Sequence, residues 1–257
     1  QIGTFTLNLP TLCNRGFFRK LAEEGQVEEI KRQLMDLDSK FRFKCRKCGK
    51  CCRHQHTILF TPRDIFNIAR KLQTTTGEVI DRYAEAYIGS ASKIPLVHMV
   101  PRGKNEVCPF LVDGLCSIHD CKPTACALFP LGRVAVNKTA LEGGSENNNP
   151  EIELEIKYML NDTDCGSRKR VNTVREWLAR FEIPEHDEFF LLWSELTIKL
   201  HAAILELEKQ HVSEETMNLF WIAVFGALYL SYDTSEEFFP QFQRAAEELS
   251  TLCREII

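Results

Sequence analysis

Cysteines are concentrated in one stretch of this chain. Eleven occur among the 257 residues, and eight of them lie between Cys45 and Cys126. The start of the chain lacks a basic segment followed by a long apolar one, which is the pattern of a secretory signal. In a reducing compartment, clustered cysteines bind metal more often than they form disulfides. We therefore expect a metal-binding protein of the cytoplasm.

The composition and charge of the chain limit its class. Hydrophobic residues make up 44% and charged residues 26%, which is typical of globular proteins and excludes a disordered or collagen-like chain. The net charge of −4 is unevenly distributed: residues 151–257 hold 10 basic and 21 acidic side chains, so the remaining 22 and 15 give residues 1–150 a net charge of +7. The longest apolar run, 219–230, is shorter than the roughly 20 residues of a membrane span, so we expect no membrane association.

The first group of cysteines has the most specific spacing. It reads Cys45-x-x-Cys48-Gly49-x-Cys51-Cys52. The C-x-x-C spacing lets two thiolates of one tight turn approach the same metal, and a glycine permits the left-handed backbone that such a turn needs. The spacing C-x-x-C-x-x-C also holds three corners of the cubane cluster in bacterial ferredoxins. The fourth ferredoxin element, C-x-x-x-C-P, is absent.

A second group of cysteines follows later in the chain. Cys108 opens a C-P-F-L run, Cys116 a C-S-I-H run and Cys126 a C-A-L-F-P run, and a Cys165-Gly pair lies further on. None of these spacings is as diagnostic as that of the first group. Cys13 and Cys253, in or beside expected helices, are predicted to be ordinary half-buried thiols.

Taken together, these motifs resemble a family of small proteins with a C-x-x-C-G-x-C-C cysteine-cluster domain, described as zinc- or iron-chelating or as iron–sulfur oxidoreductase-like. The resemblance covers about residues 41–180, and His119 and Lys122 stand where the family has Tyr and Arg. Cys121 occupies a position that is not normally cysteine, and it is an extra ligand, a redox partner or a bystander. The metal ligands that the resemblance implies are Cys45, Cys48, Cys51, Cys52, Cys108, Cys116, Cys126 and Cys165.

Two kinds of metal centre fit these eight thiolates. One [4Fe–4S] cluster would use four of them, and two zinc sites could share all eight. We favour the [4Fe–4S] cluster, because residues 42–54 hold six basic side chains and no acid, and nearby cations stabilise a cluster of net negative charge. Histidines are weaker ligand candidates, and those considered are His54, His56, His98 and His119.

The hydrophobic periodicity predicts an α+β fold in three parts. These are an N-terminal helical segment at 1–40, a metal-binding domain at 41–170 and a helical C-terminal region at 171–257. We expect strands at 57–60, 94–100, 131–137 and 151–157, with the last two forming a hairpin. We expect helices at 15–38, at 61–72 with Thr61 as N-cap, from 76 to Tyr87, and repeatedly from Val171 to the end of the chain.

Several functions remain open. The first is a redox or cluster-dependent role, either that of an electron carrier or that of an oxidoreductase-like enzyme, with a redox partner protein. The alternative is a zinc-stabilised module that binds a partner. Nucleic-acid binding through the basic cysteine loop beside Phe41 and Phe43 is less favoured because of the acidic C-terminal part. Protein methylation rests only on a related domain in flagellin lysine methylases, and no clear nucleotide-binding glycine motif supports it. No G-x-S-x-G, P-loop or H-E-x-x-H motif occurs, so catalytic residues stay unassigned.

Overall fold

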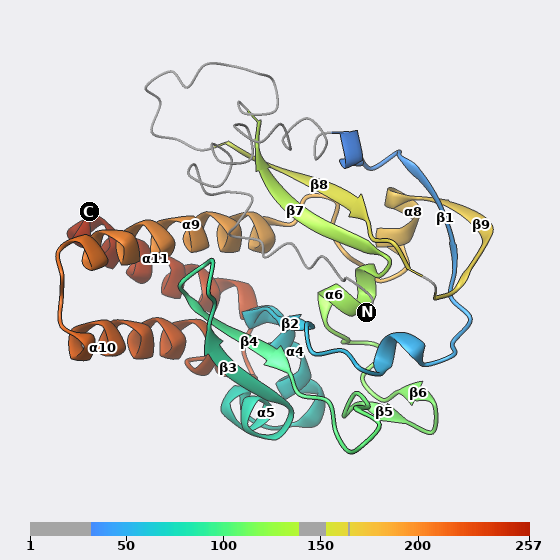
Figure 1. Cartoon of the computed structure of the whole chain (residues 1–257), viewed down its shortest axis with the longest axis horizontal. Helices are drawn as coiled ribbons and strands as arrows, with labels where there is room; N and C mark the ends of the chain where they lie inside the picture. The colour runs from blue at the N-terminus through green and yellow to red at the C-terminus, as the bar shows by residue number, and fades with distance from the viewer. Residues whose placement is uncertain (1–31, 139–152, 164) are drawn as a thin grey trace. The chain divides into compact units, whose positions relative to one another are not determined.

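The computed structural model describes residues 32–138, 153–163 and 165–257 (Figure 1). The described residues combine several small antiparallel sheets with a helical C-terminal region, which confirms the α+β prediction. Contacts divide them into two compact units: unit 1 holds the described residues through Lys44 together with Leu128–Ile198, and unit 2 holds Cys45–Ala127 and Lys199–Ile257. The three-part division expected from the sequence stays a prediction.

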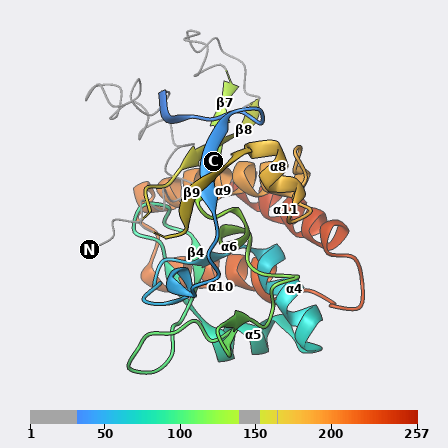
Figure 2. The ribbon, with the colours of Figure 1, turned by 90° about the vertical axis from the view of Figure 1, so that its right-hand side faces the viewer.

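Unit 1 is built on two antiparallel strand pairs. The pair formed by residues 40–44 and 167–173 lies side by side in both views (Figure 1; Figure 2). The pair formed by residues 131–137 and 154–160 is the hairpin that the sequence predicts. A capping box at Thr173 and Glu176 starts the helix that follows the first pair. The elements are β1 (Lys40–Lys44) paired with β9 (Ser167–Thr173), β7 (Leu131–Asn137) paired with β8 (Leu154–Leu160), α8 (Val174–Ala179) and the first half of α9 (Glu188–Lys209).

Aromatic rings form the core beneath β1. Phe41 and Phe43 alternate with charged residues along the strand, and both are 4% exposed. Each ring meets Trp177 edge-on, with centroids 5.6 and 5.7 Å apart. The Trp177 indole N–H donates to the Leu128 carbonyl at 2.9 Å, so the only polar atom of this side chain is satisfied inside the core.

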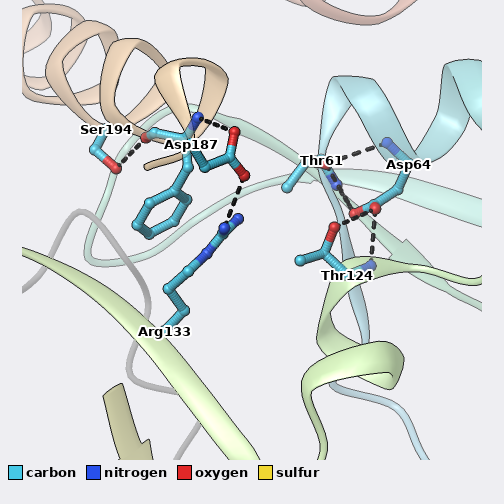
Figure 3. Close-up of polar contacts among 7 residues, drawn as sticks. Thr61, Asp64, Thr124, Arg133, Asp187 and Ser194 are labelled. Carbon is cyan, nitrogen blue, oxygen red and sulfur yellow. Dashed lines mark hydrogen bonds and ion pairs between the residues drawn. The ribbon is translucent and has the colours of Figure 1, made fainter. Parts of the chain in front are cut away.

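A buried ion pair joins β7 to the start of α9. The Arg133 guanidinium donates to the Asp187 carboxylate at 2.7 Å, and the two side chains are only 3% and 2% exposed (Figure 3). The guanidinium also lies 3.8 Å above the Phe190 ring. The other Asp187 oxygen accepts from the Phe190 backbone N–H, so Asp187 caps α9, as expected of an acid at a helix start.

Unit 2 contains a three-stranded sheet packed with helices. Its strand order is β2-β4-β3, with both neighbouring pairs antiparallel. Two capping boxes, at Thr61 and at Thr75, start its first two helices. The elements are η1 (Lys50–Cys52), β2 (Leu59–Phe60), α4 (Pro62–Leu72), α5 (Thr76–Tyr83), β3 (Ala84–Ile88), β4 (Pro95–Met99), β5 (Leu111–Val112), β6 (Leu115–Cys116), α6 (Thr124–Leu128), α10 (Glu214–Phe225), η2 (Gly226–Leu230) and α11 (Phe238–Ile256).

Three of the expected helices are wrong in part. Of the helix expected at 15–38, residues 15–31 lie outside the described residues, and the helix has ended before Met35, which pairs with Tyr158. Tyr87 lies in β3 because Ala84–Ile88 pairs with β4. Residues 171–173 belong to β9, since strand pairing with β1 outweighs the helical pattern there. Among the described residues, no helix combines the length and apolar character that crossing a membrane requires.

We predict that Asp187→Ala lowers the free energy of unfolding by about 3–5 kcal/mol, because the buried Arg133 charge loses its partner. Urea unfolding followed by circular dichroism measures the change. The matched control is Glu153→Ala, which breaks an exposed pair with Lys138 and changes stability by less than about 1 kcal/mol. Equal losses in the two variants would contradict the structural role of the buried pair.

Candidate metal centre

Five cysteine thiols of unit 2 lie close enough to alter one another's ionisation. Charges on Cys108, Cys116 and Cys126 each act on the Cys52 thiol, and Cys51 acts on the same three residues. The thiols of Cys51 and Cys52 share a hydrogen bond, which raises the pKa of Cys51 and lowers that of Cys52. We call this group the thiol site; its members are Cys51, Cys52, Cys108, Cys116 and Cys126.

A short backbone ladder brings the first cysteine group to Cys108. Gly49 has a left-handed backbone with φ of +67°, as the sequence predicts, and the chain turns there into η1. The Cys108 N–H then donates to the Cys52 carbonyl at 2.8 Å, and the His54 N–H donates to the Glu106 carbonyl at 2.8 Å. Two segments far apart in sequence are thereby held in register beside each other.

A tight hairpin then places Cys116. Leu111 pairs with Cys116 across β5 and β6, and the Leu111 N–H donates to the Cys108 carbonyl at 3.0 Å. The two turn residues, Asp113 and Gly114, both have positive φ, which is the conformation that Asp-Gly favours in a two-residue hairpin. This turn therefore returns the chain from Cys108 to the same site.

A buried carboxylate fixes the position of Cys126. Asp64 is 3% exposed, and one of its oxygens accepts from the N–H and the hydroxyl of Thr61, at 2.9 and 2.8 Å. Its other oxygen accepts from the N–H and the hydroxyl of Thr124, at 2.8 and 2.9 Å (Figure 3). One side chain thus caps α4 and also anchors the first residue of α6, which carries Cys126.

Backbone amides point at several of the sulfurs. The Lys47 N–H donates to Cys45 Sγ at 3.3 Å, across two residues. The same arrangement recurs where amides of Phe110 and Leu111 lower the pKa of Cys108, and where the Ile118 amide lowers that of Cys116. Amide donors stabilise a thiolate relative to a thiol. These amides therefore favour the charged form of the sulfur, which is the form that binds metal.

Opposing influences act on the ionisation of these thiols. Burial is the largest influence on Cys108, Cys116 and Cys126, and it raises the pKa of each one. Repulsion between neighbouring thiolates raises these pKa values further. The Lys122 ammonium acts in the opposite direction and lowers the pKa of Cys51, Cys116 and Cys126. The single positive charge of one lysine cannot balance the negative charge of five thiolates, whereas a metal ion, which carries a higher positive charge, could.

The remaining cysteines differ in their surroundings. Cys45 and Cys48 are exposed on the loop before η1. Cys165 belongs to unit 1. Cys121 lies beside Asp120 and Cys116, and burial raises the pKa of its thiol to about 11. Cys253 is buried in α11, as an ordinary core thiol would be, and Cys13 lies outside the described residues.

The described cysteines form no disulfide. Across the same described ranges, no group of three or more Cys, His, Asp or Glu side chains is placed so that it could hold a metal ion. The structure thus brings five of the eight expected ligands into mutual range without fixing a coordination geometry.

The four histidines that we considered as ligands have other contacts or neighbours. His54 and His56 both contact one oxygen of Glu106, at 2.9 and 3.2 Å. His98 faces Glu85 at 3.6 Å. Burial lowers the pKa of His119, and charges on Lys122 and Lys47 lower it further, which places this ring near the first cysteine loop. Of the four, His119 alone lies among residues that also influence the thiol site.

Sequence reasoning missed two residues that shape the site. The spacing of Thr61 and Asp64 indicates a helix start, but nothing in it shows that the same carboxylate also holds Thr124. In the sequence, Lys122 is notable only for standing where the family has Arg, whereas in the structure its charge acts on three of the thiols. The contact of Asp64 with Thr124 joins segments that are distant in sequence. The effect of Lys122 depends on the direction in which a loop side chain points.

We predict that Asp64→Asn lowers the free energy of unfolding by about 1–3 kcal/mol and weakens metal retention. An amide nitrogen cannot accept, so the donors of either Thr61 or Thr124 lose their partner inside the protein. Urea unfolding and metal content of the purified protein measure the two effects. Asp81→Asn, on the exposed face of α5, is the control and leaves both unchanged. Full metal retention in Asp64→Asn would argue against this anchoring of Cys126.

Comparison with known proteins gives one match. Residues 44–151 match the family model CxxCxxCC, described as a putative zinc- or iron-chelating domain. No curated protein and no solved structure matches the chain. The matched range includes all five members of the thiol site together with Cys45, Cys48 and Cys121, and it supports metal binding. It confirms the resemblance seen in the sequence: residues 44–151 are similar to the domains that this family model describes.

Proposed function

We propose that the thiol site holds a [4Fe–4S] cluster and gives the protein a redox or cluster-dependent role. The observation that carries this proposal is the meeting of five thiols whose charges act on one another inside unit 2. Thiolate sulfur is a soft ligand, which suits iron–sulfur clusters and zinc. The amides aimed at Cys108 and Cys116 support the charged form of both ligands.

Local charge favours the iron–sulfur centre over zinc. A cluster held by four thiolates has a net negative charge, which nearby cations stabilise. Lys122 acts on three thiols of the site. The first cysteine loop adds Arg46, Lys47, Lys50 and Arg53, with no acid between them.

The residues around the site suggest how electrons would reach it. When bound, a [4Fe–4S] cluster accepts or donates one electron at a time. The exposed loop with Cys45 and Cys48 leads in the chain directly to η1 and the thiol site, so it is the approach we assign to a redox partner protein. An acidic surface on that partner would complement the basic side chains of the loop.

A zinc-stabilised module is the second candidate function. Its support is the recurring turn in which an amide faces the sulfur two residues earlier, as at Cys45, Cys108 and Cys116, because this turn serves tetrahedral zinc equally well. In that case the metal would contribute folding free energy, and the protein would act by binding a partner.

We predict about four iron and four acid-labile sulfide per chain after strictly anaerobic purification. Elemental analysis, sulfide assay and the visible absorption spectrum measure this content. Near-stoichiometric zinc without sulfide would overturn the iron–sulfur proposal and leave the zinc module in its place.

The same measurement on variants tests the site itself. Cys126→Ala removes a thiol of the site, and we expect at least half of the iron and most of the visible absorption to be lost. Cys253→Ala removes a buried thiol of α11 and keeps both, so it controls for the loss of a cysteine as such. Equal metal content in the two variants would exclude Cys126 as a ligand.

We predict that Cys165→Ala also lowers the iron content, since the family resemblance includes this residue among the eight ligands. Its position before Gly166 is tightly defined, because Gly166 has φ of +73° and a Cβ there would lie 2.4 Å from the Phe43 ring. Unchanged iron content would confine the metal centre to the cysteines of unit 2.

A further inference from the structure

Six basic side chains lie exposed on the ribbon formed by β1 and β9. We propose that this cationic ribbon binds the phosphate backbone of a single-stranded nucleic acid, a function separate from metal binding at the thiol site. Its members are Lys40, Arg42 and Lys44 on β1 and Arg168, Lys169 and Arg170 on β9.

Strand geometry explains why all six side chains are exposed. On β1, Phe41 and Phe43 face the core, so the alternate residues point away from it, about 6.6 Å apart along one face. Arg42 and Lys44 on β1 are separated by one residue, whereas their partners on β9, Val171 and Ser167, are separated by three. This bulge holds three consecutive basic residues at the surface.

Two acids that precede β1 in sequence form ion pairs with residues outside the ribbon. Asp36 accepts from Lys157 at 2.6 Å, and Asp38 accepts from Arg175 at 3.1 Å. Asp162 lies 3.8 Å from Arg168. For the other five members, the described part of the chain supplies no acidic partner within 4.0 Å. The positive charge of the ribbon therefore remains available to an external anion.

The chemistry of the ribbon fits phosphates better than an acidic protein surface. Stable protein interfaces have an apolar, often aromatic centre and are depleted in lysine. This ribbon exposes three lysines, and the only large apolar side chain that it exposes is Val171, at 46%. Cations repeated along a strand match the regularly repeated charges of a phosphodiester chain.

The same packing limits the mode of recognition. Phe41 and Phe43 are 4% exposed, so neither can stack on a base, which removes the aromatic part of the sequence-based interpretation. Binding would be independent of nucleotide sequence and strongly dependent on salt. The net charge of −4 does not argue against it, because the deciding charge is that of the local surface.

The test uses the full-length, metal-loaded protein and a fluorescein-labelled oligouridine of about 20 nucleotides. Fluorescence anisotropy gives the dissociation constant in a series from about 50 to 200 mM salt. In the double variant Arg42→Ala/Lys169→Ala we expect affinity at the lowest salt to fall about tenfold. The slope of log affinity against log salt should become shallower by about 1.4, since each lost phosphate contact contributes about 0.7.

A matched double variant controls for the loss of two positive charges. Lys104→Ala/Arg244→Ala removes two exposed cations of unit 2, and it should bind the oligouridine as the unchanged protein does. Circular dichroism checks that both variants fold. The proposal is overturned if the unchanged protein does not bind at 50 mM salt, or if the two variants lose affinity equally. Tighter binding of polyglutamate than of oligouridine would also overturn it and assign the ribbon to an acidic protein.

Discussion

The arrangement of unit 2 depends on the buried carboxylate of Asp64. Its two oxygens accept four hydrogen bonds, two from Thr61 and two from Thr124, and Thr124 lies 60 residues beyond Asp64 in sequence. A charged acceptor makes stronger bonds than a neutral one, and the carboxylate that accepts these bonds is buried. Cys126 stands two residues beyond Thr124, so the position of a proposed metal ligand is set by the start of a helix elsewhere in the chain.

Crowding of the thiols is the second constraint. Burial and mutual repulsion favour neutral sulfur, whereas the amides of Phe110, Leu111 and Ile118 favour thiolate. These opposing influences leave the site short of positive charge when its sulfurs ionise. A metal bound there, as we propose, would supply that charge and release protons as it binds, so that contacts that are unfavourable between thiols would become favourable around a cation. The backbone ladder at Cys52 and Cys108 then serves to hold the crowded groups together.

Local sequence signals predicted the parts of this structure that local contacts decide. Thr61, Pro62 and Asp64 gave the start of α4 correctly, and the alternation at 131–137 gave β7 and its hairpin partner. The strand β9 was missed because its residues are basic and show no apolar alternation, and only pairing with β1 makes them a strand. Tyr87 fitted a helical stripe, yet pairing with β4 outweighed it. The cysteine spacing indicated metal chemistry, but it could not show that Asp64 and Lys122 shape the site.

Strand β1 serves two purposes that depend on one register. Its odd-numbered members, Phe41 and Phe43, pack on Trp177, while Lys40, Arg42 and Lys44 face solvent. Because side chains alternate with a period of two, a slip of one residue would bury the cations and expose the rings. Core packing therefore fixes the face on which the positive charge appears. The chain continues from Lys44 directly into Cys45, so the first cysteine group follows the cationic ribbon in sequence.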